Sequence, residues 1–136
     1  AVTDEVFRRI LEVNVLGTFR LTRLAMPHLK ASGDGAVVNI TSLAGVRPTG
    51  SSVPYAASKA ALNHLTALVG NVSGPEVRVN AVAPGLVQTP WTADWTALHE
   101  AMGSMAPLQR SAEPDDIAEV VVDVAAARYL TGQEAI

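Results

Sequence analysis

Apolar residues recur mainly at every third or fourth position near the start of the chain, which is the spacing of one face of an α-helix. This pattern predicts a helix from Asp4 to Lys30, capped by Thr3 or Asp4. Pro27 is expected to bend or loosen its last turns. The same reasoning predicts two more helices, each with a proline in its first turn, at residues 54–70 and 113–126.

Two short runs rich in β-branched residues predict strands at 36–40 and 77–82. The first run does not alternate between apolar and polar positions, so we expect it to be buried on both faces. A third strand is expected after Gly132, and residues 88–110 are expected to form an irregular, mobile stretch. The order strand, helix, strand, helix, strand predicts an α/β fold with a parallel sheet covered by helices.

Composition narrows the classes of function. The chain has 136 residues, enough for one domain, and a net charge of −3, which gives no reason to expect nucleic acid or a membrane surface as a partner. No apolar run is long enough to span a bilayer. The absence of cysteine excludes thiolate chemistry and fits a reducing compartment, so we expect a cytoplasmic protein. His28, His64 and His99 show no ligand-like grouping, so no metal site is predicted.

Tyr55 and Lys59 are four residues apart, which places them on one face of the predicted helix. A tyrosine hydroxyl is a poor base at neutral pH, and a neighbouring cation lowers its pKa by favouring the phenolate. Such a pair can exchange a proton with a substrate hydroxyl or carbonyl. Ser42 follows the first strand, where ligands bind in open α/β sheets, and its hydroxyl can hold a substrate oxygen. A surface contact and a polar loop are the alternatives.

Asn14 lies within an apolar helical stripe. A buried amide has to find hydrogen-bond partners or cost roughly 1–3 kcal/mol. One interpretation is an Asn that binds nearby backbone or kinks the helix. The other is an Asn that holds a water molecule connected to Lys59.

The segment Pro84-Gly-Leu-Val-Gln-Thr89 directly follows the second strand. The Pro84 carbonyl remains available as an acceptor, and the backbone of the segment, with the Thr89 hydroxyl, could bind a carboxamide. Its alternative interpretation is a plain strand stop.

In chain order, four segments resemble the successive signatures of the classical short-chain dehydrogenase/reductase (SDR) family. They are Asn14-Val-Leu-Gly, Val38-Asn-Ile-Thr-Ser42, Tyr55-Ala-Ala-Ser-Lys59 and Arg78-Val-Asn-Ala-Val-Ala-Pro-Gly85. The step of thirteen residues from Ser42 to Tyr55 also matches the family pattern. Later segments, from Glu113 to Ala118 and from Tyr129 to Gln133, are similar to the family as well.

The resemblance implies a Rossmann-like, doubly wound parallel sheet and hydride transfer between NAD or NADP and an alcohol or carbonyl substrate. It implies that Tyr55 is the general acid/base, that Lys59 lowers its pKa and binds the nicotinamide ribose, and that Ser42 orients the substrate. It further implies a proton-relay water near Asn14. The residues implied to seat the carboxamide end of the cofactor are Pro84, Gly85, Val87 and Thr89.

The family's substrate loop corresponds to residues 90–107, where Trp91 and Trp95 could line an apolar pocket. The competing interpretation is that both pack in a core or a subunit interface. The two long helices resemble those of the family's dimer interface, which implies a homo-oligomer, a dimer or a tetramer.

The glycine-rich turn that brings a pyrophosphate to a helix N-terminus has no counterpart in the sequence, because Gly33 and Gly35 precede a strand instead of following one. Residues 1–136 are therefore interpreted as the C-terminal portion of one SDR domain, with only its later strands and helices and with an open, apolar inner sheet edge. The rival hypothesis is an inactive SDR fragment that binds a partner or oligomerises. A weaker one is an epimerase or dehydratase of the extended branch.

Overall fold

The computed structural model describes residues 2–136 and opens with one long helical rod. Thr3 caps the rod, since its side chain accepts the N–H of Val6 at 3.3 Å. The rod comprises α1 (Asp4–Leu11), the π-helical segment η1 (Glu12–Gly17) and α2 (Thr18–Ser32), which contains Pro27. It ends at Gly33, whose φ of 76° is left-handed. The predicted helix is confirmed, but its π-helical segment was not foreseen.

Three parallel strands form the sheet in the order β1-β2-β3. They are β1 (Gly35–Ile40), β2 (Val77–Val82) and β3 (Glu134–Ala135). Gly35 lies opposite Val77, and Ala81 lies opposite Glu134. The predicted α/β class, the parallel pairing and the late third strand are confirmed.

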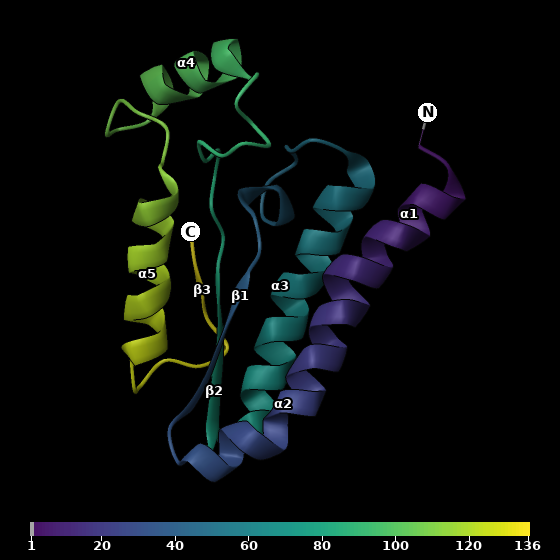
Figure 1. The fold of residues 1–136 in the computed structure, drawn as a ribbon, viewed down its shortest axis with the longest axis vertical. Coiled ribbons are helices and arrows are strands. Elements are labelled where there is room, and N and C mark those ends of the chain that lie inside the picture. Colours follow the sequence, from purple (N-terminus) through teal and green to yellow (C-terminus); the bar gives the residue numbers. More distant parts are fainter. Residues whose placement is uncertain (1) are drawn as a thin grey trace.

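Helices cover both faces of this sheet (Figure 1). The rod and α3 (Val53–Ser73) lie on one side, and α5 (Pro114–Ala126) lies on the other. The short 3₁₀ helix η2 (Leu43–Gly45) follows β1 and packs on α3. The helix α4 (Thr96–Met105) lies beyond the carboxyl end of β2, away from the turns that precede the strands (Figure 1).

The middle strand β2 holds the core. Val77, Val79 and Ala81 are fully buried, as burial between two helical layers requires. Asn80 is also buried, and its amide is paired: Nδ2 donates to the Leu130 carbonyl at 2.7 Å, and Oδ1 accepts the Gln133 N–H at 3.1 Å. This side chain therefore fixes the path of the chain into β3.

Two expectations were wrong. The first strand is not buried on both faces: its middle residues are half-buried and Ile40 is 45% exposed. The reason is that β1 pairs only with β2 within residues 2–136, so it is an outer strand with an open edge. The stretch 88–110 is not irregular throughout, because it contains α4, whose Leu98, Met102 and Met105 recur at helical spacing.

Candidate active site

The carboxyl ends of β1 and β2 are joined by backbone hydrogen bonds beyond the sheet itself. The Thr41 N–H donates to the Val82 carbonyl at 2.8 Å, and the Leu43 N–H donates to the Pro84 carbonyl at 2.9 Å. These bonds hold Ser42 beside the segment that follows β2. The Pro84 carbonyl, which we expected to remain available, is therefore used inside the protein, although its second lone pair still accepts.

Ser42 caps η2: its Oγ accepts the Ala44 N–H at 3.1 Å. A hydroxyl that accepts in this way keeps its own hydrogen to donate. Gly45 then rests on α3, since a Cβ there would lie 2.7 Å from the Lys59 carbonyl carbon and 2.8 Å from the Ala60 nitrogen. Only the absence of a side chain allows this approach, which brings the Ser42 turn against α3 at Lys59.

Tyr55 lies in the first turn of α3, after the cap Ser52 and Pro54. Lys59 lies one turn later, and its Nζ donates to the Ile40 carbonyl, at the end of β1, at 2.8 Å. The same Nζ is 5.7 Å from the centre of the Tyr55 ring. Burial lowers the pKa of the Lys59 ammonium. The structure thus brings Ser42, Tyr55 and Lys59 to one edge of the sheet.

Asn14 lies in η1 and reaches across to α3. Its Nδ2 donates to Ser58 Oγ at 3.0 Å, and that hydroxyl donates to the Tyr55 carbonyl at 2.7 Å. Ser58 is fully buried, so the amide anchors the rod to the turn that carries Tyr55. The Thr18 hydroxyl donates to the Asn14 carbonyl at 2.9 Å. Sequence reasoning missed Ser58, whose only local signal is a hydroxyl in an alanine-rich helix.

The segment after β2 is ordered by its own hydrogen bonds. Val87 pairs with Ala112 in an isolated parallel bridge. The Thr92 hydroxyl, in a residue only 4% exposed, donates to the Val87 carbonyl at 2.7 Å and accepts the Thr89 N–H at 3.1 Å. Gly85 has no heavy atom within 4 Å of the position a Cβ would take, so space remains beside its backbone.

An aromatic cluster stands next to Tyr55. The Trp91 ring lies 6.3 Å from the Tyr55 ring, and the Trp95 ring lies 5.4 Å from that of Trp91, all between centroids. Trp91 is 65% exposed. It does not lie in the core, and its free surface adjoins the proposed acid/base.

The other features lie elsewhere. Within residues 2–136, no group of three or more His, Cys, Asp or Glu side chains is placed to hold a metal ion. His99 is paired, with Nδ1 2.9 Å from Ser111 Oγ and Nε2 3.2 Å from the Thr92 carbonyl oxygen. None of the helices described here is both long and apolar enough to cross a bilayer.

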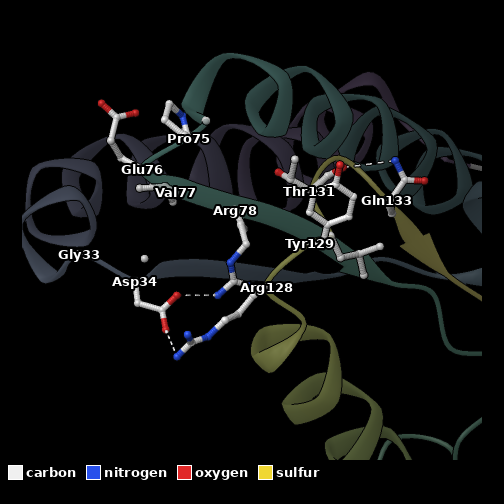
Figure 2. A pocket seen from close by; sticks show the side chains of 13 residues that line it. Gly33, Asp34, Pro75, Glu76, Val77, Arg78, Arg128, Tyr129, Thr131 and Gln133 are labelled. Carbon is white, nitrogen blue, oxygen red and sulfur yellow. Dashed lines mark hydrogen bonds and ion pairs between the residues drawn. The ribbon is translucent and has the colours of Figure 1, made fainter.

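A cavity of about 730 Å³ opens at the opposite end of the sheet, before the strands begin (Figure 2). Arg78 and Arg128 both pair with Asp34 there, at 3.2 and 3.9 Å. This cavity is separate from Tyr55, and none of the catalytic candidates lines it. Size alone would have pointed to the wrong end of the molecule.

Known proteins share these features along the whole chain. The family model described as enoyl-(acyl carrier protein) reductase matches residues 1–136. The protein predicted to be ketoacyl reductase 2 of the granaticin polyketide synthase in Streptomyces violaceoruber is 50% identical over 98% of this chain and 55% of its own length. The short-chain dehydrogenase/reductase homolog YusR of Bacillus subtilis is 44% identical over 86% of this chain and 91% of its own length.

Solved structures agree with the fold. The structure of ElxO with NADP bound has a TM-score of 0.87 at 26% identity, over 98% of this chain and 57% of ElxO. The chain spans about half the length of most curated relatives that it matches, with YusR as the exception. The similarity runs through the segments that carry Asn14, Ser42, Tyr55 and Lys59. The chain therefore belongs to the short-chain dehydrogenase/reductase family.

Proposed function

We propose that this chain carries the acid/base half of an NAD(P)-dependent oxidoreductase that interconverts an alcohol and a carbonyl. In the reducing direction, the Tyr55 hydroxyl gives its proton to the carbonyl oxygen, and in the oxidising direction it takes that proton back. Ser42 donates a hydrogen bond to the same oxygen. The observation that carries the proposal is the placement of Lys59, bound to the end of β1 and 5.7 Å from the Tyr55 ring, where its positive charge favours the phenolate.

The residues present fit the nicotinamide end of such a cofactor. When bound, the nicotinamide supplies or accepts the hydride at the substrate carbon. The Lys59 ammonium has three N–H donors and uses one on Ile40, so two remain for ribose hydroxyls. The open space beside Gly85 leaves the backbone of residues 84–89 accessible to a carboxamide. ElxO, which has the same fold, is known with NADP bound.

Asn14 acts through α3. Its hydrogen bond to the buried Ser58 holds the turn between Tyr55 and Lys59 against η1. In the proposal a water molecule near this π-helical segment passes the proton between Lys59 and solvent. The distortion of the helix supports this role, because π-helical segments leave backbone groups free for other partners and often occur at functional sites.

The test compares two tyrosine variants of the purified chain in a nicotinamide absorbance assay with simple ketones and alcohols. Tyr55→Phe keeps the ring and removes the proton, so turnover should fall at least about 100-fold. Tyr129→Phe is the matched control, because Tyr129 is fully exposed and lines the cavity at the far end of the sheet. Turnover that survives in Tyr55→Phe would contradict the proposal.

A second candidate is a module that oligomerises or binds a partner. Large apolar side chains on the rod support it, because Val13 and Leu16 in η1 and Leu21 and Leu24 in α2 are all exposed, as is the edge of β1. Sedimentation of the chain tests this candidate. A dimer or tetramer that dissociates in Leu21→Glu but not in Arg9→Glu, on the exposed surface of α1, would support it, and a monomer would exclude self-association.

A further inference from the structure

We propose that the substrate carries an aromatic or other flat conjugated ring next to its reacting carbon, and that Trp91 holds this ring. The inference rests on the proposed function, since it names the substrate class of that site. It starts from a concentration of aromatic side chains. The chain has two Trp, two Tyr and two Phe residues, and half of them, Tyr55, Trp91 and Trp95, form one cluster.

The exposure of Trp91 is unusual for its size. An indole buries more apolar surface than almost any other side chain when it packs, yet this one is 65% exposed. The Trp95 ring meets it at 56° and the Tyr55 ring at 57°, so both contacts are tilted and use only part of the indole. The rest of the ring is free to stack on a flat ligand.

The position of the free indole defines what it would bind. Its centroid is 6.3 Å from the ring whose hydroxyl is the proposed proton donor. A ring joined directly to a carbonyl carbon would therefore reach Trp91 while the carbonyl oxygen lies at Tyr55. Stacked or edge-to-face pairs of aromatic rings are preferred at such separations. Saturated rings of the same size lack this geometry, so they should bind roughly two- to tenfold more weakly.

The indole is held in place by its backbone. The Thr92 N–H donates to the Thr89 carbonyl, and the Trp95 N–H donates to the Thr92 carbonyl, both at 3.0 Å. His99, in the first turns of α4, contacts the same Thr92 carbonyl through Nε2 at 3.2 Å. Two successive turns and a histidine thus fix the peptide on either side of Trp91. A ring presented from such a backbone is a preorganised surface, which lowers the entropic cost of binding.

Intrinsic fluorescence tests this directly, because the only two tryptophans of the chain are in the cluster. Purified chain is titrated with 1-phenylethanol and with 1-cyclohexylethanol, which differ only in the flatness of the ring. We expect the phenyl compound to change the emission with a Kd two- to tenfold lower. Trp91→Leu, which keeps apolar bulk, should lose this preference, and Trp91→Phe should keep it.

Turnover of acetophenone and cyclohexyl methyl ketone separates this inference from the proposed function. Reduction of both ketones with equal kcat/KM, or equal binding of the two alcohols, would overturn the aromatic preference and leave the oxidoreductase intact. Aromatic binding that depends on Trp91 without any turnover would leave the ring site standing and remove the chemistry. If neither alcohol alters the emission, and acrylamide quenching falls as chain concentration rises, Trp91 is a subunit contact and the inference is wrong.

Discussion

Gly45 is the residue at which the Ser42 turn rests on α3, so replacing it with alanine tests whether this contact holds the site together. A Cβ at Gly45 would lie 2.7 Å from the Lys59 carbonyl carbon, 2.8 Å from the Ala60 nitrogen and 3.0 Å from Asn63 Nδ2. Two of these three atoms belong to the backbone of a helix, which cannot move aside locally.

The size of the effect follows from the distances. Ordinary contact begins at 3.4 Å, so η2 and α3 have to separate by about 0.7 Å. Overpacking of this kind costs about 1–3 kcal/mol of stability. A misplacement of ~1 Å can also cost on the order of 100-fold in rate. If the proposed chemistry is right, Gly45→Ala should therefore lose about tenfold or more in kcat/KM.

Urea unfolding measured by far-ultraviolet circular dichroism gives the stability of the variant. Gly103→Ala is the matched control, because Gly103 is also buried and helical but its Cβ would meet its nearest neighbours at 3.5 Å. There the change should be neutral or stabilising by up to ~1 kcal/mol. The reasoning fails if Gly45→Ala is as stable as the parent chain.

Three further predictions concern the contacts around the site and the start of α5. A double-mutant cycle on Asn14→Ala and Ser58→Ala should give a coupling energy of about 1 kcal/mol, and additive effects would mean that their hydrogen bond does not join η1 to α3. Burial lowers the pKa of Lys59 below 10.5, so the unfolded chain binds more protons below that pH; stability should rise as pH approaches 10.5, and Lys59→Met should lack this rise in urea titrations. The hydrogen bond from Arg110, together with that from the Glu113 N–H, lowers the pKa of Asp116 to about 2, so its stabilising effect should be complete above 3.8 and lost as pH falls through about 2. Acid unfolding curves of the parent chain and Asp116→Asn should therefore converge at low pH, and a constant difference would contradict the assignment.

Much of the fold could be predicted because it is local. Apolar spacing placed the long rod, α3 and α5, and β-branched runs placed β1 and β2. Errors arose where the environment decides. The open side of β1 depends on which strands pair with it, and α4 has a helical pattern that is hard to see among the turns around it.

The candidate site divides in the same way. Helical periodicity alone puts Tyr55 and Lys59 on one face, and the rule for parallel sheets alone puts Ser42 at the same edge. The bond between Asn14 and Ser58, by contrast, joins residues 44 positions apart, and no local pattern indicates it. The sequence also left Trp91 open between a pocket, a core and an interface.

The sequence by itself determined the α/β order of elements, the family and the residues able to exchange a proton, because backbone periodicity and side-chain chemistry are written along the chain. Only the tertiary structure decided that Gly45 allows η2 to meet α3, that Asn14 anchors this helix through Ser58, and that Trp91 stands exposed beside Tyr55. These facts depend on distances between segments remote in sequence, which packing sets and periodicity does not record.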